Sequence, residues 1–162
     1  MGHIQTQEEW EVQMAEKILS YVRNELYLEL RYLDVAFSAL VPQADASLQS
    51  FAMDGGHLFY STEQILRVFE KNAPYLNRAY LHTVLHCIFS HPWIAGNRDR
   101  RLWNLACDVA VEYTIDGLGK KCTKRILSWT RQKLYEELRE QKKGVSLSLI
   151  HISEPTRPEP IS

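Results

Sequence analysis

The sequence predicts a predominantly helical α+β domain that carries one small β-hairpin. Over most of the chain, apolar residues recur every three or four positions, which is the period of an amphipathic helix. The main exception is Asp54-Gly55-Gly56, a turn signal with short apolar segments on both sides. The chain has 162 residues, of which 45% are hydrophobic and 24% charged, as is typical of one globular domain.

Composition argues against several classes of protein. The formal net charge of −1 provides no overall field that would attract nucleic acid or an anionic membrane. No apolar run is long enough to span a bilayer, and residues 1–10 are too polar and acidic for a secretory signal. Cys87, Cys107 and Cys122 form no CxxC pair, which indicates reduced core thiols. We therefore expect a cytoplasmic protein with no membrane partner and no general affinity for nucleic acid.

The N-terminal region predicts helix from Thr6 to Pro42. Thr6 and Glu9 have the spacing of a capping box, which marks a helix start. Apolar residues then recur at helical intervals, which predicts either one long helix or two helices broken near Asn24. These residues are Trp10, Met14, Ile18, Val22, Leu26, Leu30, Leu33, Phe37 and Leu40. The small, polar segment 43–49 is predicted to be a loop.

The hairpin and a helix pair are predicted next. Residues 51–53 and 57–60 flank the turn and form its two strands. Ser61 and Gln64 form a second capping box, which opens a helix that ends near residue 70. Pro74 suits the first turn of a following helix that extends to about Ser90.

Two further helices complete the prediction. Pro92 disfavours helical backbone at the residue before it, and residues 95–100 are a polar loop. A helix over 102–116 follows and is predicted to be closed by Gly117. A basic loop over 120–125 then precedes a last amphipathic helix over 129–141.

The C-terminal tail has the character of a sequencing artefact. Residues 147–157 can be encoded by DNA that resembles a transposase-type library adapter read in frame. We therefore divide the chain into a domain over residues 1–144 and a non-native, adapter-derived tail over residues 145–162. In this interpretation the gene was interrupted near Gly144, and the domain is the N-terminal part of a longer protein. A natural Pro-rich tail is the alternative.

The histidines of the segment 81–91 form a candidate metal site. His82 and His86 are four residues apart, so on a helix they lie on one face, one turn from each other. Two imidazoles with this spacing can bind one zinc ion. His91 lies just beyond the helix, where a chain reversal would return it as a third ligand. The alternative is a set of ordinary histidines at a helix surface.

The helix that follows carries a polar stripe. Asn104, Asp108, Glu112 and Asp116 recur every four residues on an otherwise apolar helix. This stripe faces either solvent or a polar site. In the second case, Asp108 or Glu112 would meet the histidines as a metal ligand or as an acceptor for an imidazole N–H.

These segments together resemble a known family. The hairpin over 51–60, the histidine segment over 81–93 and the block LWNLACDVAVE over 102–112 are similar to the metallopeptidase domain that precedes a VWA-like domain in bacterial proteins. The resemblance covers most of residues 8–141. It implies a zincin-like fold, bound zinc, a peptide or protein substrate lying along the hairpin, and a C-terminal VWA-like domain that this chain lacks. It also implies work alongside a MoxR-like AAA+ ATPase.

This sequence departs from the family at one functional position. Many members carry the zincin motif HExxH, whose glutamate takes a proton from zinc-bound water, whereas this chain has Thr83 at that place. A threonine hydroxyl has too high a pKa to act as that base near neutral pH. The sequence therefore supports a metal site better than it supports an enzyme.

Three functions follow from these observations. The first is a zinc-dependent hydrolase, in which His82 and His86 bind zinc with His91 or Asp108, and Glu112 acts as the base. The second is a catalytically inactive zincin-like scaffold that binds a partner. The third is a metal-dependent nuclease, favoured only by the basic loop over 120–125, which is better interpreted as a solvated turn.

Overall fold

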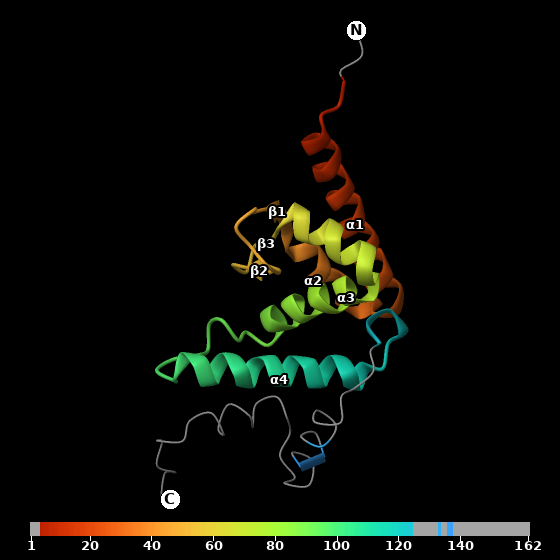
Figure 1. Cartoon of the computed structure of the whole chain (residues 1–162). Coiled ribbons are helices and arrows are strands. Elements are labelled where there is room, and N and C mark those ends of the chain that lie inside the picture. The colour runs from red at the N-terminus through yellow and green to blue at the C-terminus, as the bar shows by residue number, and fades with distance from the viewer. Residues whose placement is uncertain (1–3, 125–132, 134–135, 138–162) are drawn as a thin grey trace, which may run out of the picture. The chain divides into compact units, whose positions relative to one another are not determined.

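The computed structural model describes residues 4–124 together with Lys133, Glu136 and Glu137. Its fold is α+β and predominantly helical, which confirms the predicted fold class (Figure 1). The predicted helix over 129–141 falls almost entirely outside the described residues. The predicted tail over 145–162 and the domain boundary at residue 144 also lie outside them.

The described residues fall into two compact units whose boundary lies within one helix. The first unit contains residues 4–85 together with 120–124. The second contains residues 86–119 together with Lys133, Glu136 and Glu137. The first unit holds α1 (Gln7–Glu29), α2 (Asp34–Ala39), a three-stranded sheet and most of α3 (Thr62–Ile88). The second unit holds the end of α3 and α4 (Arg100–Leu118).

Helix α1 begins as predicted. Thr6 Oγ1 accepts a hydrogen bond from the Glu9 N–H at 3.2 Å, and Glu9 Oε2 accepts one from the Thr6 N–H at 2.9 Å. These two bonds satisfy backbone donors that the first helical turn leaves unpaired. Of the predicted stripe, Ile18, Val22 and Leu26 are buried, but Trp10 is 45% exposed and Met14 is half-buried. Ala15 and Leu19 complete the buried face.

The helix break near Asn24 was wrong, because α1 continues to Glu29. The backbone leaves the helical region at Leu30, where φ is −132° and the N–H still bonds to the Leu26 carbonyl. A short 3₁₀ helix, η1 (Arg31–Leu33), then leads into α2. Leu30 and Phe37 are both fully buried, so the position of the break follows core packing rather than the weak helix propensity of asparagine.

The sheet has the strand order β1-β3-β2 and includes one strand that the sequence did not predict. Strands β2 (Ala52–Met53) and β3 (His57–Tyr60) are antiparallel, which confirms the hairpin, and Gly55 has φ of 95° in the turn. Strand β1 (Val41–Ala44) pairs with β3 in parallel, so the predicted loop over 43–49 was wrong at its start. All four β1 residues are exposed, so the sequence here lacks the alternation of apolar and polar residues that predicts a half-buried strand.

The ends of α3 and α4 differ from those predicted. Within α3 the backbone is non-helical at Asn72 (φ −160°, ψ 80°), two residues before Pro74, in agreement with the two helices expected over this segment. Helix α3 ends at Ile88, earlier than the expected Ser90. Helix α4 continues through Gly117 and is closed by Gly119, whose φ of 62° is left-handed. Gly117 was therefore the wrong glycine, since only a residue at positive φ can provide this kind of C-cap.

The turn after α4 is held by hydrogen bonds to side chains of the first unit. A 3₁₀ helix, η2 (Lys121–Thr123), forms here, and the Glu29 carboxylate accepts hydrogen bonds from the N–H groups of Lys121 at 3.0 Å and Cys122 at 3.1 Å. The buried side chains of Asn77 and Arg78 donate to the carbonyls of Cys122 and Thr123 at 3.0 and 3.2 Å. The described part of the predicted basic loop is thus an ordered turn, on which the side chains of Lys121 and Lys124 are exposed.

Two of the three cysteines predicted to be core thiols are buried, whereas Cys87 is half-buried. Cys107 and Cys122 are buried, and burial raises the pKa of each thiol to about 11, so both are protonated at neutral pH. Among the described residues, we find no helix with the length and apolar character needed to cross a membrane.

Candidate metal site

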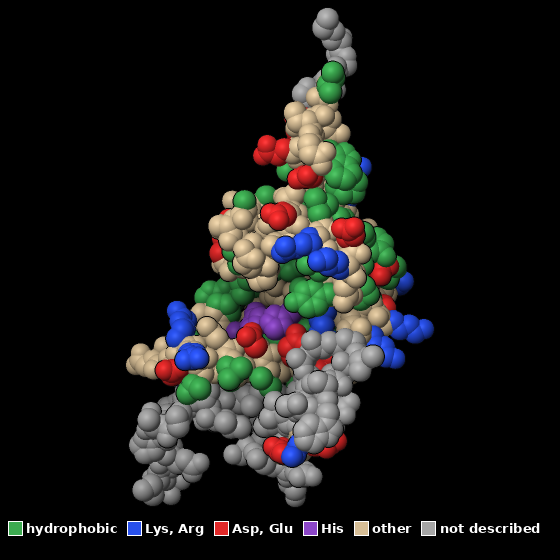
Figure 2. Space-filling model, viewed as in Figure 1, with side chains coloured by type: hydrophobic (Ala, Val, Ile, Leu, Met, Phe, Trp, Pro, Cys, Tyr) green, Lys and Arg blue, Asp and Glu red, His purple; other side chains and the backbone are tan. Residues whose placement is uncertain are grey.

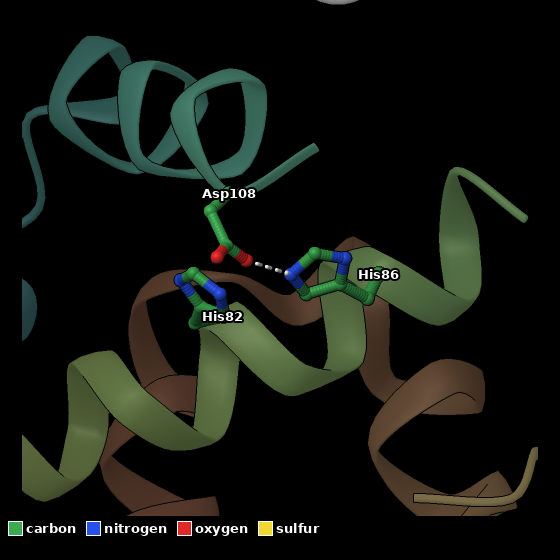
Figure 3. A group of neighbouring side chains, drawn as sticks. All are labelled: His82, His86 and Asp108. Carbon is green, nitrogen blue, oxygen red and sulfur yellow. Dashed lines mark hydrogen bonds and ion pairs between the residues drawn. The ribbon is translucent and has the colours of Figure 1, made fainter. Parts of the chain in front are cut away.

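The two candidate histidine ligands lie on the last turns of α3. His82 and His86 are one turn apart and both are half-buried. The residues between and beside them, Leu81, Val84 and Leu85, are buried, so this part of the helix is packed on its other faces. The helical spacing anticipated from the sequence is therefore present, and Figure 3 shows both rings on one side of α3.

Asp108 of α4 completes a group of three possible ligands. Its Oδ1 lies 3.0 Å from Nε2 of His86. One ligand atom each from His82, His86 and Asp108 lies within 4.8 Å of the others, as expected of residues that could hold a metal ion (Figure 3). The Asp108 side chain is 55% exposed, whereas that of His86 is 18% exposed. The exposure of Asp108 makes this end of the group accessible from solvent. Figure 2 shows histidine side chains at the surface beside acidic ones on the face drawn.

His91 does not lie where a third metal ligand was expected. It is not part of the three-residue group, but its Nδ1 lies 3.0 Å from Nδ1 of His86, on the opposite side of that ring from Asp108. His91 is only 4% exposed. Of the two candidates for a third ligand, the structure brings Asp108 to the histidine pair and places His91 behind His86.

A Schellman motif at the end of α3 explains the position of His91. The His91 N–H bonds to the His86 carbonyl at 3.1 Å, and the Ser90 N–H bonds to the Cys87 carbonyl at 3.0 Å. Ser90 has φ of 58°, the left-handed conformation that this motif requires. The motif characteristically brings together the side chains that here are His86 and His91, and their ring centroids are 5.1 Å apart.

Trp103 also contributes to the site, although its sequence position indicated only a core residue. Its Nε1 donates to the His91 carbonyl at 3.1 Å, and its ring meets that of His91 edge to face, with centroids 6.2 Å apart. Trp103 is 2% exposed, and the guanidinium of Arg98 lies over its ring at 4.8 Å. A buried tryptophan N–H usually has a hydrogen-bond acceptor, and this requirement was the sequence signal that could have indicated a polar partner for Trp103.

The structure also describes Glu112, the candidate base, and Thr83, which occupies the position of the zincin glutamate. Glu112 follows Asp108 by one turn of α4 and is half-buried, but it does not belong to the three-residue ligand group. Thr83 is 8% exposed, and its Oγ1 donates to the Ala79 carbonyl at 3.0 Å. The hydroxyl is therefore bound to its own helix, one turn back, as is common for threonine within helices.

Comparison with known proteins adds no further constraint. Protein-family models, curated proteins and solved structures contain no match to this chain. The case for function therefore depends on the chemistry of the residues themselves.

Proposed function

We propose that this chain is a zincin-like metal-binding domain that holds one zinc ion through His82, His86 and Asp108. The observation that carries the proposal is the grouping of two imidazoles and a carboxylate with ligand atoms within 4.8 Å. Two histidines and one carboxylate are an established donor set for zinc sites that keep a fourth position open. Exposure of Asp108 leaves room for water at such a position.

The separations suit an ion of this size. Two ligand atoms about 2.1 Å from a tetrahedral zinc ion lie roughly 3.4 Å apart. His86 Nε2 and Asp108 Oδ1 are 3.0 Å apart, so an ion could replace their hydrogen bond with little movement. His82 lies one turn from His86 on the same helix, and rotation of its side chain would bring its ring to the ion.

The proposal extends to metallopeptidase chemistry in a weakened form. Zinc, when bound, supplies a Lewis acid and lowers the pKa of an accompanying water to ~7. The protein would still have to accept a proton from that water. Thr83 cannot do so, since its hydroxyl donates to Ala79 and its pKa is too high. Glu112 is the remaining candidate base, and we expect negligible peptidase activity from the wild-type domain.

A catalytically inactive scaffold is the second candidate function. It is favoured by the environment of Thr83, which occupies the position of the zincin base. This side chain is buried, and its hydroxyl donates to the Ala79 carbonyl of the same helix. In either case the resemblance to the bacterial metallopeptidase family suggests a cytoplasmic protein that cooperates with a MoxR-like AAA+ ATPase. The nuclease alternative was favoured only by the basic turn, and the hydrogen bonds from its backbone to the Glu29 carboxylate add no support for it.

Zinc titration of the purified chain tests the proposal. Wild-type protein stripped with chelator should bind one equivalent of zinc, measured by isothermal calorimetry and elemental analysis. His82→Ala, His86→Ala and Asp108→Asn should each weaken binding by at least about tenfold, because each removes a ligand. His57→Ala is the matched control, since His57 also lies 3.0 Å from a carboxylate, that of Asp54, yet belongs to no three-ligand group among the described residues. Absence of stoichiometric binding, or equal loss in the control, would refute the proposal.

A further inference from the structure

The environment of His91 is that of a residue that positions another side chain. Its ring is buried at 4% exposure and contacts three other rings: His86 at 5.1 Å, Phe89 at 5.4 Å and Trp103 at 6.2 Å between centroids. Its carbonyl accepts from Trp103 and its N–H donates to the His86 carbonyl. The backbone and the ring of His91 are thus both restrained, and Nδ1 is held 3.0 Å from Nδ1 of His86.

For two neutral rings, these hydrogen bonds fix which nitrogen of each ring carries the proton when no ion is bound. An ionised carboxylate only accepts, so His86 must donate through Nε2 to Asp108. A neutral imidazole carries one N–H, which leaves Nδ1 of His86 as an acceptor. His91 must then donate through its own Nδ1. In this state His86 is the Nε2–H tautomer and His91 is the Nδ1–H tautomer.

A metal at the proposed site requires the opposite arrangement. Nε2 of His86 must present its lone pair to the ion, so the proton of this ring moves to Nδ1. The contact with His91 is kept only if His91 accepts at Nδ1 and carries its proton on Nε2. A pair of neutral rings holds one proton on each ring before and after this exchange, so the pair neither gains nor loses a proton. Asp108, no longer an acceptor for His86, is available as a ligand.

We infer that His91 is the positioning residue of this metal site, and that its contact with His86 exchanges donor and acceptor when the ion binds. This inference rests on the proposed zinc site. Ligating histidines commonly donate their second N–H to a protein acceptor, which orients the ring and raises its basicity. Here the acceptor is a second imidazole, which the Schellman motif places at the correct distance.

Two variants separate hydrogen bonding from packing. His91→Phe keeps an aromatic ring but cannot accept, and it should weaken zinc binding about 10–100-fold. His91→Asn offers an amide oxygen close to the position of Nδ1, and it should restore affinity to within about threefold of wild type. Phe89→Leu is the matched control, because it removes a ring beside His91 without removing a hydrogen bond, and it should leave affinity within about threefold.

Nitrogen-15 NMR of the imidazoles gives a readout that a merely structural role would not move. Titration of wild-type protein with zinc should convert His86 from Nε2–H to Nδ1–H and His91 from Nδ1–H to Nε2–H. An unchanged His91 tautomer on zinc binding, or wild-type affinity in His91→Phe, would overturn the positioning role while leaving the metal site intact. Failure of the wild-type chain to bind zinc would overturn both. If His91→Phe does not fold, the wild-type spectra and His91→Asn decide the question.

Discussion

Replacing Thr83 with glutamate should show whether the proposed site lacks only a proton acceptor. Position 83 directly follows His82, which is where an HExxH motif carries its glutamate. In the wild type, Thr83 is 8% exposed and its hydroxyl donates to the Ala79 carbonyl at 3.0 Å. A carboxylate introduced here could extend past the helix surface toward the ion, where it could take a proton from water.

The expected gain follows from the contribution of general-base catalysis. A positioned base contributes about 10²–10⁴-fold in rate. Thr83→Gln provides the matched comparison, since glutamine has nearly the same size and no basic group. Both variants lose the hydrogen bond to Ala79, at a cost of about 0.5–1.5 kcal/mol. With zinc bound, Thr83→Glu should therefore cleave peptides about 10²–10⁴ times faster than Thr83→Gln.

The assay is hydrolysis of a quenched fluorogenic protein substrate at saturating zinc, repeated after chelation. Thermal denaturation of both variants establishes that they are equally folded. Equal, negligible rates in two variants that bind zinc like the wild type would refute the idea that a base alone is missing. Efficient cleavage by the wild type, abolished in Glu112→Gln without loss of zinc, would instead identify Glu112 as the base.

Three further predictions concern the scaffold. Glu29→Ala should lower the free energy of unfolding by about 1.5–3 kcal/mol in urea denaturation, since its carboxylate accepts from the N–H groups of Lys121 and Cys122; an unchanged midpoint would contradict this. Gly119→Ala should destabilise by about 1 kcal/mol because φ is 62°, whereas Gly117→Ala, inside α4 with open space around it, should stabilise by about 0.5–1 kcal/mol. The same sign for both glycines would show that the cap is misplaced. The N–H groups of residues 56 and 57 lower the pKa of Asp54 from 3.8 to about 2, so its contribution to stability is present above pH ~4 and lost as pH falls toward 2. Asp54→Asn should accordingly be less stable than wild type at pH 6, and thermal melts should converge near pH 2; a gap that does not narrow would exclude this origin.

Local interactions are the part of this fold that could be predicted from sequence. The capping box at Thr6, the hairpin around Gly55 and the break before Pro74 depend on residues within a few positions of one another. The spacing of His82 and His86 is also a local feature, because residues four positions apart on a helix lie on the same face. Each of these features could be inferred from one short segment without knowledge of the rest of the chain.

Contacts between distant segments were decided only by the tertiary structure. The parallel pairing of β1 with β3 joins segments that lie apart in the sequence, and the end of α1 depends on the burial of Leu30. No local pattern in the sequence predicts either feature. The same is true of the site. The sequence by itself determined that two histidines share one face of α3 and that Asp108 lies on a polar stripe. It left open whether His91 or Asp108 joins them, because that choice depends on where the chain reverses after α3. The left-handed residue at the end of α3 turns His91 back against His86, and α4 then supplies Asp108 to the opposite nitrogen of the same ring.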